Sequence, residues 1–141
     1  VRYGVMHRNT YIQSPKLLNV GFQFRTRPEL FFAGQMTGVE GYVESAASGM
    51  IAGINMARFL EGKDLLKLNN KTSIGSLSCY VANPSVTEFV PMNANFGIFE
   101  ELQGKIYKKS RKAKYAERAL EELENLLKEI KGEDCAKENE E

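Results

Sequence analysis

The residues with the clearest chemical potential are three glycines, Gly34, Gly38 and Gly41, which stand between an apolar segment and a helical pattern. Glycine has no Cβ atom, so backbone amides at such a turn can face a ligand without side chains in the way. The positive end of the following helix would favour negative charge on that ligand. The alternative is a plain turn that needs positive φ angles. The spacing of the glycines does not decide between a ligand-binding turn and a plain turn, because it is not a GxGxxG fingerprint.

A second group of candidates is the basic stretch KIYKKSRKAK at residues 105–114. Clustered cations neutralise phosphates and Tyr107 can stack on a base, so Lys108, Lys109 and Arg111 are candidate RNA contacts. The alternative is a solvated, lysine-rich start of the last helix, balanced by the acidic tail. No signature of an RNA-binding module accompanies the stretch.

Few other side chains are reactive. His7 is the only histidine, and its simplest interpretation is a hydrogen-bonded loop residue. Cys79 fits the apolar face of a short helix and Cys135 lies in a polar tail, so neither has a visible activating environment and neither is expected to be a nucleophile. Their separation also argues against a disulfide framework or a metal cluster.

Composition describes an ordinary globular polypeptide. The 141 residues are 43% hydrophobic and 26% charged, with a net charge of +1, which is enough apolar mass for one core. No apolar run approaches the ~18 residues of a membrane span, and a reducing cytoplasm is the expected compartment. Because the chain starts at Val1, directly in a strand-like segment, we expect it to be a fragment of a larger protein.

The elements that must position these residues follow from local patterns. Short runs of β-branched and aromatic residues predict strands at 1–5 and 17–24, and a buried strand at 30–33 ends at Gly34. A helical period then runs from Tyr42 to Leu60 and ends before Gly62. Its expected inward face is apolar: Val43, Ala46, Ala47, Met50, Ile51, Ile54, Ala57 and Leu60. Its many small residues predict the close approach of a strand or a cofactor.

Three further elements are expected beyond this helix. A short helix at 72–81 would have Thr72 or Ser73 as its N-cap. The aromatic segment 89–99 has no period and is expected to be an ordered loop over the core. An amphipathic helix is predicted at 110–131, and the acidic tail 132–141 is expected to be disordered.

A long resemblance joins these elements. FFAGQMTGVEGYVESAASGMIAGINMARFL at 31–60, VRYGVMHRNTYIQSPKLL at 1–18 and PMNANFGIF at 91–99 resemble the C-terminal flavin-binding segment of the TrmFO family, the folate- and FAD-dependent tRNA (uracil-5-)-methyltransferases. The resemblance implies an α/β fold. Residues 1–104 would be the C-terminal portion of a glutathione-reductase-like FAD-binding domain, followed by a basic segment and C-terminal helix at 105–131.

The resemblance also implies roles for individual residues. Gly34 and Gln35 would end a strand at the second FAD motif, and the segment from Gly41 to Val43 would begin a helix beneath the N1/C2 carbonyl edge of the flavin. The implied cofactor-binding residues are Gly34, Gln35, Met36, Thr37, Gly38, Gly41, Tyr42 and Val43.

The same resemblance points to the folate side of the site. His7 could stack on the pterin, with Arg8 and Asn9 as polar contacts. The catalytic cysteines of the family lie in parts of its chain that are not in this sequence, and no metal is implied.

The parent enzyme implied by the resemblance would transfer a methylene group from methylenetetrahydrofolate through reduced FAD to carbon 5 of a uracil in the tRNA T-loop, with NAD(P)H as reductant. Its partners would be tRNA, folate and the remainder of the parent chain. The fragment alone is expected to be inactive and to retain little FAD, because the first dinucleotide-binding half is absent.

Two alternatives remain open at this point. One is a non-catalytic module that binds tRNA or a partner through its basic stretch and last helix. The other is a GidA-like flavoprotein that modifies tRNA wobble uridines, since that family shares the AGQ-x-x-G pattern, although VEGYVESAASG and PMNANFGIF favour the TrmFO family.

Overall fold

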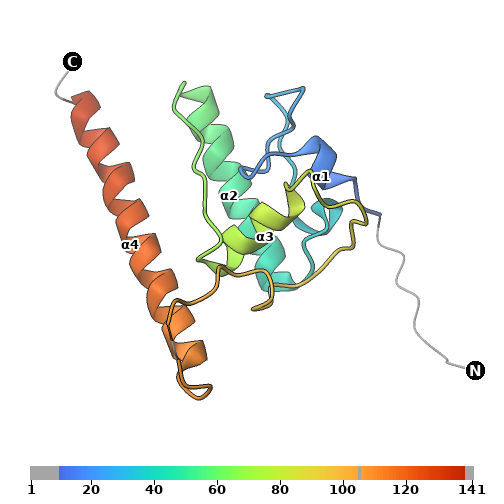
Figure 1. Ribbon diagram of the computed structural model, residues 1–141. Coiled ribbons are helices and arrows are strands. Elements are labelled where there is room, and N and C mark those ends of the chain that lie inside the picture. Colours follow the sequence, from blue (N-terminus) through green and yellow to red (C-terminus); the bar gives the residue numbers. More distant parts are fainter. Residues whose placement is uncertain (1–9, 105, 139–141) are drawn as a thin grey trace, which may run out of the picture.

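The computed structural model describes residues 10–104 and 106–138, with side chains up to Lys131. Five helical elements follow one another along it: α1 (Ser14–Leu17), the 3-10 helix η1 (Gly34–Thr37), α2 (Tyr42–Leu60), α3 (Ser73–Val81) and α4 (Arg111–Glu138). Helices α2 and α3 contact each other inside a body wrapped by long loops, and α4 runs along one side of that body (Figure 1).

The predicted strands at 17–24 and 30–33 do not form, and the described part of the chain is mostly helical. Its only β pairings are isolated bridges, Leu18 with Phe24, Gln23 with Phe31, and Val39 with Met92. A strand needs a neighbour along its whole length, and the 17–24 segment instead folds back on itself. The strand predicted at 1–5 lies outside the described residues. The α/β character expected from the sequence is therefore not confirmed.

A side-chain turn explains why 17–24 bends. The Asn19 Oδ1 atom accepts hydrogen bonds from the backbone amides of Gly21 at 2.9 Å and Gln23 at 3.1 Å. Such a local bond competes with a strand ladder. Phe22, at the corner, has a φ of 63° and is fully buried, so burial of its ring holds a backbone conformation that is uncommon for a residue with a side chain.

Helix α2 has the bounds that the sequence predicts, but most of the expected inward face is exposed. Val43 is 79% exposed, Met50 60% and Leu60 78%, and nothing among the described residues lies within 4 Å of where a Cβ of Gly49 or Gly53 would stand. Of the eight expected inward positions only Ile51 is buried, and the other buried residues of α2 are Ser48, Ala52, Asn55 and Arg58. No strand approaches the small residues of α2 in the described part of the chain.

Asn55 shows why polar residues of α2 turn inward. Its Nδ2 donates to the backbone oxygens of Gly21 at 3.1 Å and Leu66 at 3.0 Å, and its Oδ1 accepts from the Leu66 amide at 2.6 Å. Buried loop carbonyls and amides need such partners because water cannot reach them. The polar side of α2 therefore organises the loops on either side of it.

The hydrophobic core lies between these loops, α2 and α3. Its buried members are Phe22, Val39, Ile51, Ala52, Leu66, Leu68, Leu77, Val81 and Phe89. Met92, Ala94 and Ile98 pack against it, which confirms the ordered loop predicted at 89–99.

Helix α3 forms as predicted and is capped by Thr72. The Thr72 Oγ1 accepts a hydrogen bond from the Gly75 amide at 3.1 Å, which satisfies one donor of the first turn. A Cβ at Gly75 would collide with the backbone oxygen of Asn69. Only glycine fits this approach of the 69–72 loop to the helix.

Helix α4 begins at Arg111 and continues through Glu138, beyond the predicted end at Lys131. Leu126 and Ile130 pack against the core, whereas Leu120 is 63% exposed and Leu127 55%. The predicted apolar stripe is thus only partly covered by the described residues.

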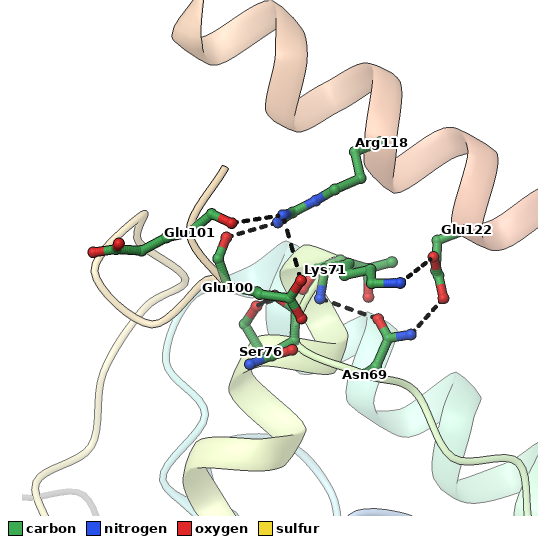
Figure 2. Close-up of polar contacts among 9 residues, drawn as sticks. Asn69, Lys71, Ser76, Glu100, Glu101, Arg118 and Glu122 are labelled. Carbon is green, nitrogen blue, oxygen red and sulfur yellow. Dashed lines mark hydrogen bonds and ion pairs between the residues drawn. The ribbon is translucent and has the colours of Figure 1, made fainter. Parts of the chain in front are cut away.

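Polar contacts complete the docking of α4 (Figure 2). Glu122 accepts hydrogen bonds from the Lys71 Nζ at 3.1 Å and from the Asn69 side chain. One turn earlier, Arg118 donates to the backbone oxygens of Glu100 at 2.9 Å and Glu101 at 3.4 Å. Two separate loops are therefore tied to the same helix.

Candidate cofactor site at the start of helix α2

The glycine turn is held in place by hydrogen bonds from both of its flanks. The Gly34 amide donates to the Ser48 Oγ at 2.8 Å, and the Thr37 Oγ1 donates to the Gly34 oxygen at 2.7 Å. From the other side, the Ser14 Oγ donates to the Thr37 oxygen at 2.8 Å. The turn is thus fixed relative to α2 before any ligand arrives.

Each of the three predicted glycines has a positive φ: 66° at Gly34, 84° at Gly38 and 98° at Gly41. A Cβ at Gly38 would overlap the Phe89 ring, so this glycine allows close packing against the core. A Cβ at Gly41 would lie 2.8 Å from the Asn93 Nδ2 and would also meet the Glu44 carboxylate. Gly41 therefore lets the side chains of Glu44 and Asn93 approach the backbone at the start of α2.

A cavity of about 370 Å³ opens at this end of α2, lined by Gln35, Gly41, Tyr42 and Ser45. Gly41 is the N-cap and provides no side-chain cap. The amides of Tyr42, Val43 and Glu44 donate to no acceptor in the described part of the chain, as expected for the first turn of an uncapped helix. These donors and the helix dipole suit an acceptor or anionic edge of a ligand.

The structure separates the eight predicted cofactor residues into three groups. Gln35, Gly41 and Tyr42 line the cavity, and the Tyr42 side chain is 98% exposed. Met36 and Val43 do not line it: Met36 is 49% exposed, and Val43 is 79% exposed and lines another cavity together with Ile74 and Leu123. The remaining three, Gly34, Thr37 and Gly38, form the turn, with Thr37 fully buried. Ser45 was missed by sequence reasoning, although its place one helical turn after Gly41 would indicate it.

The predicted folate contacts His7, Arg8 and Asn9 lie outside the described residues. Cys79 is half-buried, and burial raises the pKa of its thiol, which disfavours the reactive thiolate and agrees with the expected inert role. Among the side chains that the structure describes, no group of three or more His, Cys, Asp or Glu residues could hold a metal ion. No helix in the described ranges is long and apolar enough to cross a membrane.

The basic stretch borders a second cavity, of about 330 Å³. Its lining residues are Phe96, Gly97, Phe99, Glu101, Lys108, Arg111, Lys112 and Tyr115. Two of the three predicted RNA contacts, Lys108 and Arg111, are therefore brought together with aromatic rings, and Lys109 is exposed next to them. Sequence reasoning missed the rings because Phe96 and Tyr115 meet only in the folded chain. The signal that could have found them is the aromatic segment before the basic stretch.

Comparison with known proteins first defines the class. A family model described as "Glucose inhibited division protein A" matches residues 1–64. A solved structure titled "Structure of Aquifex aeolicus GidA in the form II crystal" is similar with a TM-score of 0.50 and 28% identity, over 84% of this chain and 20% of that chain. The glycine turn and helix α2 thus belong to a GidA-related fold.

More specific relatives carry one common name. The chain is 58% identical over 91% of its length to "Methylenetetrahydrofolate--tRNA-(uracil-5-)-methyltransferase TrmFO" of Bacillus licheniformis. It is 56% identical over 92% to the TrmFO of Anoxybacillus flavithermus and 54% identical over 90% to that of Natranaerobius thermophilus. These homologues confirm the family resemblance predicted from the sequence. The chain spans about 30% of the length of these curated relatives.

Proposed function

We propose that the protein carrying this chain is a tRNA (uracil-5-)-methyltransferase that forms 5-methyluridine in the T-loop from methylenetetrahydrofolate, with FAD as cofactor and NAD(P)H as reductant. The observation that carries the proposal is the cavity formed by Gln35, Gly41, Tyr42 and Ser45 at the uncapped start of α2. Three of these residues, Gly41, Tyr42 and Ser45, fall within VEGYVESAASG, one of the two segments that favour the TrmFO family.

The residues of this cavity fit the edge of a flavin ring. The amides of Tyr42 and Val43 have no acceptor within the described residues and would donate to the carbonyl edge. The Gln35 side chain offers both a donor and an acceptor, and the exposed Tyr42 ring offers an apolar face to a planar heterocycle.

When bound, FAD would supply the redox chemistry, whereas the residues of this chain bind and orient. Because the positive end of α2 is fixed by the Gly34–Ser48 hydrogen bond, it would stabilise negative charge at that edge without rearrangement. The nucleophilic cysteines, the folate contacts at His7, Arg8 and Asn9, and a cytoplasmic location are parts of the same proposal.

The test uses the full-length protein and has two readouts. The purified protein should be yellow with a flavin absorption spectrum. With methylenetetrahydrofolate and NADPH it should produce 5-methyluridine at the T-loop of a tRNA transcript, detected by nucleoside mass spectrometry after fragment mapping. A colourless protein that also fails to take up added FAD would overturn the proposal.

The same assay separates the two alternatives. Modification at the wobble position in place of the T-loop would indicate a GidA-like activity, which the lower identity to GidA, 28% against 58% to TrmFO, does not favour. Binding of tRNA with neither flavin nor modification would indicate a non-catalytic module.

A further inference from the structure

We propose that the cavity between the 96–101 loop and the start of α4 binds one unpaired nucleotide of RNA, with its base on Phe96 and its phosphates at Lys108, Arg111 and Lys112. This inference rests on the proposed tRNA substrate and adds where and how that substrate is held.

Three aromatic rings make the apolar part of the cavity. Tyr115 is only 5% exposed and forms its base, with the Phe96 ring 5.0 Å away at 34° and the Phe99 ring 5.4 Å away at 72°. Phe96 remains 49% exposed. An exposed ring supported by two others presents a stacking surface that costs little to order, which suits a nucleobase.

Cations stand at the rim of the same cavity. Lys108, Arg111 and Lys112 are exposed and line it, and none of them forms an ion pair within the described side chains. Lys114, in contrast, is paired with Glu117 at 2.8 Å. The charge of the three cations beside the aromatic rings therefore remains available for phosphate.

The cavity is also held rigid. The Arg118 guanidinium lies 5.3 Å from the centroid of the Tyr115 ring while donating to the backbone oxygens of Glu100 and Glu101 (Figure 2). Loop and helix are thereby joined directly next to the cavity. A preformed site loses less conformational entropy on binding than a loose one.

Glu101 decides what kind of anion fits. Glu101 also lines the cavity, and its carboxylate would repel a ligand that is anionic throughout, whereas it can accept hydrogen bonds from the N–H groups of a base. The cations at 108, 111 and 112 lie in series along the chain, which suits successive phosphates of a polymer.

The size of the cavity also fits a nucleotide. Its volume of about 330 Å³ is within the roughly 300–1,000 Å³ of small-ligand sites.

The experiment measures binding of a fluorescently labelled tRNA transcript to the full-length protein by anisotropy, at several salt concentrations. Phe96→Ala should raise the Kd about 5- to 150-fold, the loss expected for one stacked base, while Phe96→Tyr should bind almost as the unchanged protein does. The double variant Lys108→Gln/Lys112→Gln should lower the salt slope by about 2. Lys128→Gln, an exposed charge farther along α4, is the matched control and should change neither quantity.

Equal tRNA affinity of Phe96→Ala and the unchanged protein would overturn the inference, as would a loss of methylenetetrahydrofolate affinity in place of RNA affinity. Flavin content keeps this failure distinct from failure of the proposed function. If the protein holds FAD and makes 5-methyluridine but tolerates Phe96→Ala, only the cavity assignment is wrong. If Phe96→Ala weakens RNA binding in a protein that never holds flavin, only the proposed function is wrong.

Discussion

At the scale of single residues, Gly41 and Gly62 make an instructive pair. Both have positive φ values, 98° and 68°, but a Cβ at Gly41 would enter a crowded space beside Asn93, whereas a Cβ at Gly62 would meet nothing within 4 Å. One glycine borders the candidate cofactor cavity and the other only ends α2. An alanine would strain the backbone at either position. Only at Gly41 would it also disturb the candidate cofactor cavity.

We expect Gly41→Ala in the full-length protein to reduce bound FAD, because the added Cβ strains the turn that presents the Tyr42 and Val43 amides. Gly62→Ala should destabilise the protein by on the order of 1 kcal/mol, the cost of an alanine at positive φ, and keep its flavin. The ratio of flavin to protein absorbance and the thermal midpoint are measured for both. Similar flavin contents in the two variants would contradict this role for Gly41.

At the scale of elements, the docking of α4 depends on a charged contact that acid should weaken. Hydrogen bonds from Asn69 and Lys71 lower the pKa of Glu122 from its usual value. A carboxyl with a lowered folded-state pKa stabilises the fold above its ordinary pKa, and this contribution is lost as the pH falls through the lowered value. Glu122 and Lys71 are 29% and 34% exposed, so solvent screening keeps the effect within about 1 kcal/mol.

Glu122→Gln is therefore expected to be less stable than the unchanged protein at pH 7, and this difference in unfolding free energy should shrink as the pH falls through the lowered pKa of Glu122. Glu124→Gln, an exposed position on the same helix, corrects for the general titration of carboxylates. Urea unfolding of the full-length variants at pH 7 and pH 3.5 gives the comparison. The prediction is wrong if both variants show the same change in unfolding free energy between these pH values.

Elements also show where sequence reasoning succeeds. The bounds of α2 and the Thr72 cap of α3 were predictable because helical period and capping are local properties of the chain. The prediction of strands at 17–24 and 30–33 was wrong, because a strand forms only with a partner of matching length and local patterns do not show whether that partner is present. For the same reason the glycine turn could be predicted, whereas the contact of Phe96 with Tyr115 depends on tertiary packing.

At the scale of the whole molecule, the most informative feature is the exposed apolar face of α2. Val43, Met50, Ile54 and Leu60 are between 38% and 79% exposed, and Gly49 and Gly53 leave open space between them. The sequence pattern predicts that this face is buried, but the described residues do not cover these four side chains. The prediction failed because periodicity reports that a face needs a partner without identifying the partner.

The 141-residue chain expressed alone is accordingly expected to bind the dye ANS and to retain little FAD. Exposed apolar surface of this extent favours dye binding and self-association, and only one side of the proposed flavin site is present. Fluorescence with ANS and absorbance after incubation with FAD and gel filtration provide the measurements. Met50→Lys should reduce the dye signal. Stoichiometric FAD on the isolated chain would contradict the expectation.

The hydrogen bonds around Met92 couple the two cavities in space. Met92 donates to the Gly38 oxygen at 3.0 Å and accepts from the Glu40 amide at 3.0 Å, so the segment that leads to Phe96 is fastened to the glycine turn. Four residues of chain span roughly 14 Å at most, which sets an upper limit on the distance between the Cα atoms of Met92 and Phe96. The short segment 93–95 thus limits how far the proposed nucleotide site can lie from the glycine turn at the proposed flavin edge.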